Sequence, residues 1–119
     1  FLKAAQRMKW RQEGKWIVAT SLVNSFESGS ARLLIILGAD IALVASGTKK
    51  GEMRISTRAS NRIVSKGFNL ATILESVVEE NGGSAGGHPG AAGYNGIGDP
   101  EAITEMTRQK CVSRLKQLP

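Results

Sequence analysis

A single histidine, His88, lies in the glycine-rich segment GGSAGGHPGAAGYNG at residues 82–96. In glycine-rich turns, successive backbone N–H groups form concave sites for anions, because no Cβ atom keeps the ligand away. An imidazole adds one donor when it is neutral and two when it is charged. Gly86, Gly87 and His88 would therefore aim several donors at one point, which suits a phosphate group. The alternative interpretation is a plain glycine-rich connection that carries a surface histidine.

A second group of candidate residues lies in the segment EMRISTRAS at residues 52–60. Its strict alternation predicts a strand with Arg54, Ser56 and Arg58 on one face. Two guanidinium groups on one sheet face repel each other unless an anion lies between them. Guanidinium groups bind phosphate in a bidentate manner, and a serine hydroxyl adds a further donor. The alternative is a solvated face whose arginines pair with carboxylates from elsewhere in the fold.

Metal binding and nucleophilic catalysis are less well supported by these residues. The chain has no second histidine, its single cysteine, Cys111, lies in a core-like helical pattern, and no acidic residue neighbours His88. This set lacks the ligands of a metal site. Asp40 and Asp99 have structural positions at a loop and a helix cap, and no nucleophile-elbow motif is present, which disfavours a Ser-His-Asp triad. A Walker loop is absent, and the glycine spacing follows a helix rather than a strand, unlike a dinucleotide fingerprint.

Length, charge and cysteine content limit the class of protein. At 119 residues the chain has the length of one domain and can bury a core without disulfides. Its net charge of +6 favours anionic partners such as nucleotides or nucleic acid. A single cysteine excludes a disulfide framework within the chain and fits a cytoplasmic location. No apolar run approaches the length of a membrane span, and no signal-peptide pattern opens the chain, so we expect no membrane partner.

The periodicity of the chain predicts alternating helices and strands. We expect helices over 1–13, 30–38, 69–83 and 100–117, strands over 15–20, 39–47, 52–60 and about 91–95, a polar loop over 21–29, and a glycine-rich loop before the last strand. Asn69 and Asp99 are expected to cap the last two helices. The strand over 39–47 is apolar on both faces, which is typical of the middle of a sheet. This order predicts an α/β fold with a single mixed β-sheet and helices packed on it.

The first helix carries the basic residues Lys3, Arg7 and Arg11 on one face, which is either a solvated face or the wall of a cleft between domains. The chain begins at Phe1, inside this expected helix. We therefore expect residues 1–14 to be the end of a linker helix and the chain to be a piece of a longer protein.

The two candidate segments together resemble a known family. GGHPGAAG at residues 86–93 matches the Gly-Gly-His-x-x-Ala-Ala-Gly signature of the DHHA1 domain, and EMRISTRAS resembles the arginine-and-serine strand of that family. The resemblance covers roughly residues 15–117, so residues 15–119 are expected to form one DHHA1-like domain. DHHA1 is the C-terminal, substrate-binding half of the DHH phosphoesterases. That group includes RecJ-like single-strand exonucleases, phosphatases of short oligonucleotides, and cyclic-dinucleotide phosphodiesterases.

The resemblance implies a division of labour between two domains. In the family, an N-terminal DHH domain holds Mn²⁺ (or Mg²⁺) with an Asp-His-His motif, and the metals activate water. This chain has one histidine and lacks that motif, so we expect it to bind without cutting and to hold no cofactor of its own. The expected partners are single-stranded nucleic acid or a short oligonucleotide or dinucleotide, and the protein's own N-terminal DHH domain.

The same resemblance implies a set of phosphate-binding residues. Gly86, Gly87 and His88 would contact the phosphate, and Arg58, with Ser56 or Arg54 beside it, would complete the pocket. The full implied set is Arg54, Ser56, Arg58, Gly86, Gly87, His88, Ala91, Ala92 and Gly93. The alternative function is a non-catalytic nucleic-acid-binding module, related to the C-terminal domain of alanyl-tRNA synthetases.

Overall fold

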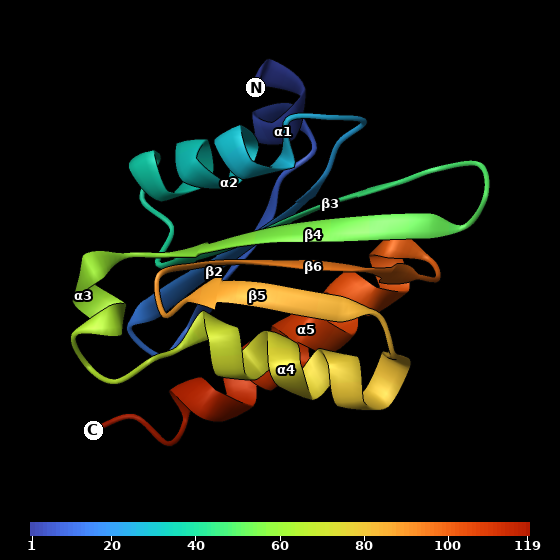
Figure 1. The fold of residues 1–119 in the computed structure, drawn as a ribbon. Coiled ribbons are helices and arrows are strands. Elements are labelled where there is room, and N and C mark those ends of the chain that lie inside the picture. Colours follow the sequence, from blue (N-terminus) through green and yellow to red (C-terminus); the bar gives the residue numbers. More distant parts are fainter.

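Six strands form one mixed sheet through the centre of the molecule (Figure 1). The computed structural model describes residues 1–119. The strands are β1 (Lys9–Glu13), β2 (Trp16–Leu22), β3 (Ile41–Gly47), β4 (Glu52–Ala59), β5 (Ser84–His88) and β6 (Ala91–Ile97). Their order is β1-β2-β3-β4-β6-β5. Only β2 and β3 run parallel, and all other neighbours are antiparallel, which confirms the expected single mixed sheet.

Helices cover both faces of this sheet. They are α1 (Leu2–Gln6), α2 (Glu27–Ile36), α3 (Asn61–Val64), α4 (Leu70–Asn81) and α5 (Pro100–Leu115). Helix α2 packs against β3 and β4 on one face, with α1 beside it, whereas α4 and α5 pack against the opposite face (Figure 1). No helix is both long and apolar enough to cross a membrane.

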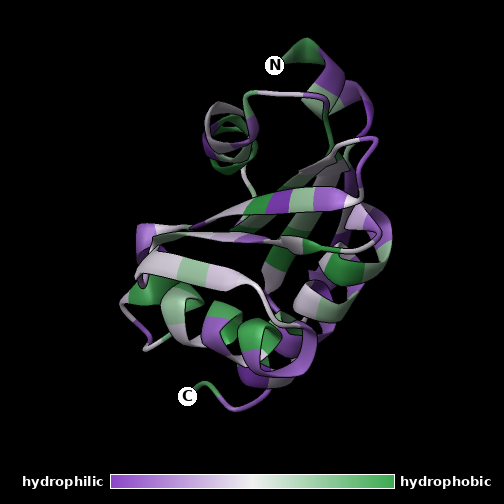
Figure 2. Cartoon of the chain, turned by 45° about the vertical axis from the view of Figure 1, so that its right-hand side comes forward, coloured by the Kyte–Doolittle hydropathy of each residue, from purple (hydrophilic) through white to green (hydrophobic).

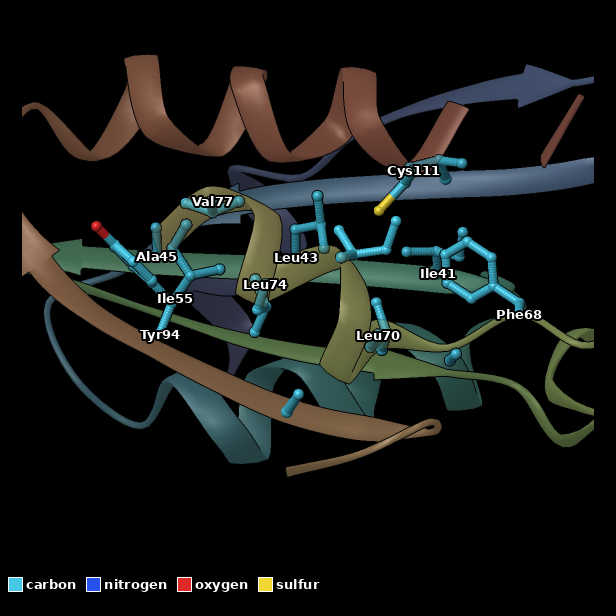
Figure 3. Packing of buried hydrophobic residues seen from close by; sticks show 14 of the residues in the cluster. Ile41, Leu43, Ala45, Ile55, Phe68, Leu70, Leu74, Val77, Tyr94 and Cys111 are labelled. Carbon is cyan, nitrogen blue, oxygen red and sulfur yellow. The ribbon is translucent and has the colours of Figure 1, made fainter. Parts of the chain in front are cut away.

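The larger hydrophobic core lies between the sheet and the pair α4 and α5. Ile41, Leu43 and Ala45 of β3 point into it and meet Leu70 and Leu74 of α4 (Figure 3). A smaller core lies under α1 and α2 and includes alternate residues of the same strand, so β3 is buried on both faces, as expected. Hydrophobic residues accordingly concentrate on the central strands, whereas β5 is pale in the hydropathy colouring (Figure 2).

Both expected caps of the last two helices are confirmed. The Asn69 side chain accepts hydrogen bonds from the N–H groups of Ala71 and Thr72 at the start of α4. The Asp99 side chain accepts from the Ala102 N–H at the start of α5. These bonds satisfy N–H groups that have no partner within the helix.

The expected helix over residues 1–13 is wrong beyond Gln6. Residues 9–13 form β1, which pairs with β2 across a turn in which Gly14 has a positive φ of 64°. The basic residues that suggested a helical face thus divide between a short helix and an edge strand. Pairing with an existing strand outweighs a weak local preference for helix.

Three further segments differ from expectation. Helix α2 begins at Glu27 within the expected polar loop, and Ser30, the first residue of the expected helix, is buried inside it. The glycine-rich segment is an antiparallel hairpin of β5 and β6 rather than a loop and one short strand. The short helix α3 was not expected from the sequence. It begins after Ser60, whose Oγ accepts from the Ile63 N–H.

Cys111 is fully buried in the larger core (Figure 3), and burial raises the pKa of its thiol to about 12. We therefore expect no alkylation of folded protein by iodoacetamide at about pH 8, because the thiolate is the reactive form. The thiol stays neutral in the folded chain but ionises above about pH 8.5 in the unfolded chain, so its contribution to stability is lost as the pH rises from about 8.5 toward 12. Alkylation monitored by mass spectrometry, with and without denaturant, tests this; rapid labelling of folded protein would contradict it.

Candidate functional site

The sheet register places the two candidate segments on one face. Residues directly opposite each other on neighbouring strands point to the same side. Arg58 of β4 lies opposite Ala91 of β6, which lies opposite His88 of β5. We call this the open face: the α2 side of β4, β6 and β5, with three cross-strand rows. The rows are Arg58, Ala91 and His88; Ser56, Gly93 and Gly86; and Arg54, Asn95 and Ser84.

At one end of the open face, Arg58 and His88 border a hollow of about 430 Å³. Their backbones are two strands apart, or about 10 Å. The C-terminal half of α2 and the corner after β4 form the other walls. The lining residues are Arg32, Ile35, Ile36, Arg58, Ala59, Ser60, Asn61, His88, Gly90 and Ala91. None of them is acidic, so the hollow combines two guanidinium groups with an imidazole and suits an anion.

The turn that carries His88 is anchored on both sides. It consists of Pro89 and Gly90, between the paired residues His88 and Ala91. The Leu70 N–H donates a hydrogen bond to the Pro89 carbonyl (3.0 Å), and the Ala59 N–H donates to the Gly90 carbonyl (3.0 Å). These bonds join the turn to the start of α4 and the end of β4. The imidazole therefore stands on a fixed hairpin and not on a free loop.

Arg54 and Arg58 have no carboxylate partner. The ion pairs of the chain are Arg62–Asp40, Arg108–Glu13, Arg108–Glu105 and Lys110–Glu80. The structure therefore contradicts the alternative interpretation, in which these arginines pair with carboxylates. The two arginines are four positions apart along β4, which corresponds to about 13 Å between their backbones. Arg54 thus does not complete the hollow at Arg58 and lines a second hollow instead.

The glycines of the β5–β6 hairpin fall into two groups, according to whether the fold has room for a side chain at their positions. At Gly87, φ is +144° and an added Cβ would lie 2.8 Å from the Ala92 Cβ, so the fold itself requires glycine. At Gly86 an added Cβ would meet nothing within 4 Å, and at Gly93 its nearest neighbour would be the Ile55 carbonyl oxygen at 3.7 Å. Packing does not demand glycine at these two positions. Their missing side chains leave a bare backbone floor in the middle row of the open face.

Not every implied residue points to the open face. The Ala92 side chain is buried in the larger core, and its carbonyl accepts a hydrogen bond from the Thr57 Oγ. Gly87 lies opposite Ala92 and shares its side of the sheet. Any contact of these two residues with a ligand on the open face must therefore come from the backbone. The implied residues that do share the open face are Arg54, Ser56, Arg58, Gly86, His88, Ala91 and Gly93.

Sequence analysis missed several residues beside the site. Arg32 projects from α2, a helix whose packing on β4 no local pattern reveals. Ser60 and Asn61 come from the unexpected corner before α3. This corner is fixed by the buried carboxylate of Asp40, which accepts from the Ser60 Oγ (3.1 Å) and from Arg62 (3.0 Å). The Arg62 guanidinium in turn lies 4.8 Å above the Trp16 ring, a cation–π contact.

The chain contains no group of three or more His, Cys, Asp or Glu side chains placed to hold a metal ion. Its residues therefore do not fit the Mn²⁺ or Mg²⁺ of the DHH phosphoesterases, and we derive no step of a reaction through a metal within this chain.

Comparison with known proteins decides the family. The model of the DHHA1 domain matches residues 8–113, which include β1 to β6 and most of α5. The chain belongs to the DHHA1 domain family. A curated relative, an uncharacterised protein of Methanocaldococcus jannaschii, is 41% identical over 95 residues. That match covers 79% of this chain and 29% of the relative, so this chain matches less than a third of the length of that protein.

Solved structures share the fold of this DHHA1 domain at low sequence identity. The C-Ala domain of Aquifex aeolicus alanyl-tRNA synthetase has a TM-score of 0.68 and 18% identity, and the match covers 88% of this chain and 98% of that one. RecJ of Thermus thermophilus, in complex with Mn²⁺, has a TM-score of 0.60 and 15% identity, covering 86% and 14%. A pGpG-specific phosphodiesterase of Vibrio cholerae, PggH, has a TM-score of 0.59 and 14% identity, covering 98% and 37%.

Proposed function

We propose that this DHHA1 domain is the substrate-binding part of a DHH-family phosphoesterase or single-strand-specific exonuclease. It holds a phosphate of the nucleotide substrate between Arg58 and His88. The observation that carries this proposal is their common row on the open face, beside a hollow without acidic residues. Both side chains can donate hydrogen bonds, and neither has a carboxylate partner, so together they suit the binding of an anion.

The hydrolytic step would belong to a separate DHH domain of the same protein, with Mn²⁺ or Mg²⁺ as its metal. Two observations support this division. The DHHA1 domain has no metal-ligand cluster of its own, and it spans only 29% of the curated relative. RecJ, which shares the fold, has been solved with Mn²⁺ and with Mg²⁺. The task of this domain is then to fix the phosphate in line with the attacking water, which is a positioning role.

The test is the variant Arg58→Ala. Loss of a charge-assisted phosphate contact is expected to weaken binding of a fluorescent oligothymidylate about 10- to 100-fold in an anisotropy titration. The slope of log affinity against log salt should also fall by about 0.7, because one phosphate contact on a single strand is lost. Arg58 makes no ion pair, so the circular dichroism spectrum and melting temperature should not change.

Lys116→Ala is the matched control. This exposed lysine follows the C-terminal end of α5 and lines none of the hollows on the open face. The substitution Lys116→Ala removes one positive charge, as Arg58→Ala does, so any effect of net charge alone appears in both variants. A folded Arg58→Ala protein with wild-type affinity and wild-type salt dependence would contradict the proposal.

A second candidate function is a nucleic-acid-binding module without a hydrolytic partner domain. It is favoured by the match to almost the whole C-Ala domain of an alanyl-tRNA synthetase, which shows that this fold occurs outside phosphoesterases. An activity assay on the full-length protein distinguishes the two functions. Release of mononucleotides from a single strand in the presence of Mn²⁺ supports the phosphoesterase, and binding without release supports the module.

A further inference from the structure

A second basic hollow lies at the opposite end of the open face. It has a volume of about 680 Å³ and is lined by the end of β3, the β3–β4 turn, β4 and β6. Its lining residues are Ser46, Thr48, Lys50, Glu52, Met53, Arg54, Asn95, Gly96 and Ile97. Lys50 and Arg54 bring two positive charges against the one negative charge of Glu52.

The polar groups of this end resemble those of the first hollow. Arg54, Asn95 and Ser84 form one cross-strand row, so a guanidinium, an amide and a hydroxyl face the same side. Arg54 is exposed and takes part in no ion pair. The carboxylate of Glu27, on the same side of the sheet, is engaged by the Ser46 Oγ. Glu27 keeps its negative charge there, but neither Lys50 nor Arg54 forms an ion pair with it or with Glu52.

The middle row connects the two ends. Ser56 is half-buried, and Gly93 and Gly86 present backbone only, so no large side chain of the strands themselves stands between the hollows. The path from Arg58 to Arg54 is about 13 Å long, at about 3.3 Å per residue. This distance exceeds the separation of neighbouring phosphates in a single strand, so two phosphates at the two arginines would not be adjacent ones. Arg54 and Arg58 line different hollows, one at each end of this path.

We propose that the open face binds a continuous single strand of several nucleotides, with one phosphate at Arg58 and His88 and a second, non-adjacent phosphate at Arg54 and Lys50. This inference rests on the proposed function and defines its substrate class further. The ligand is a phosphodiester chain long enough to span the middle row, and a mononucleotide or dinucleotide occupies only the end at His88. Arg54 thus determines the preferred substrate length.

The test compares two ligands and two variants. The ligands are the dinucleotide pdTpdT and the hexanucleotide (dT)₆, and binding is measured by titration calorimetry at constant salt. Arg54→Ala is expected to weaken binding of (dT)₆ about tenfold, to lower its salt slope by about 0.7, and to leave pdTpdT unchanged. Arg58→Ala is expected to weaken both ligands. Lys116→Ala is again the control for net charge, and circular dichroism checks the fold of each variant.

Three results would overturn the inference, and they differ in what they imply for the proposed function. If Arg54→Ala weakens neither ligand while Arg58→Ala weakens both, the second phosphate position is wrong and the first stands. If Arg54→Ala weakens both ligands equally, the two arginines serve one phosphate and the length preference is wrong. If neither ligand binds the wild-type chain, the proposed function fails together with the inference.

Discussion

Replacing His88 by Ala is expected to lower the turnover of the proposed full-length phosphoesterase about 100-fold, because a misplaced phosphate no longer meets the attacking water in line. The melting temperature should hardly change, since the imidazole is exposed and contributes little burial. The bound metal should also be unchanged, because His88 belongs to no metal-ligand cluster in this chain. The three measurements are turnover with a single-stranded substrate, thermal unfolding, and metal content by mass spectrometry.

The variant His88→Asn gives a readout that a purely structural histidine would not produce. The Asn side chain keeps an N–H donor at this position, so it should recover part of the affinity and turnover that His88→Ala loses. Full turnover in His88→Ala would disprove the phosphate contact, and loss of metal would show that His88 is a ligand.

Gly87→Ala is expected to destabilise the domain by about 2 kcal/mol or more, since it combines a strained positive φ with overpacking against Ala92. For a domain of this size that corresponds to a fall in melting temperature of roughly 8 °C or more. Thermal unfolding followed by circular dichroism measures the change. The destabilisation should appear with and without ligand, because its origin is the fold.

Gly86→Ala is the matched control for this prediction. Its added methyl group meets nothing within 4 Å, and the backbone there does not have a positive φ. The variant should melt within about 2 °C of the wild type but bind (dT)₆ more weakly, because the methyl group stands on the floor of the open face. If Gly86→Ala and Gly87→Ala behave alike in both measurements, the assignment of structural and ligand-facing glycines is wrong.

The sequence predicts the chemistry of the site better than its shape. The alternation in β4 is strong because one face is buried, so the arginine-bearing face follows from Met53, Ile55 and Thr57 alone. The signature around His88 is specific enough to indicate the family. The resemblance to the family predicts Arg54 beside Arg58 in one pocket, whereas in the structure the two arginines line different hollows.

The remaining features depend on tertiary contacts that no local pattern carries. Glycine has a low preference for strands, yet β5 forms because it pairs with β6 and lies against α4. Arg32 reaches the hollow only because α2 packs across β4. The corner at Ser60 depends on Asp40, which is twenty residues earlier in the chain and joins the corner only in the folded sheet.

The two-residue turn at Pro89 and Gly90 constrains how this domain can change in length. In an antiparallel hairpin, a shift of one residue turns every side chain to the opposite face. A loss or gain of one residue in this turn that shifts the register would carry the imidazole of His88 from the open face to the side occupied by Ala92 and α4. The β3–β4 turn, at residues 48–51, lies outside the row of Arg58 and His88, and extra residues there leave that row intact. Lineages of this domain should therefore hardly vary in length at the Pro89–Gly90 turn, whereas a change in length at the β3–β4 turn would affect only the second hollow, which Lys50 lines.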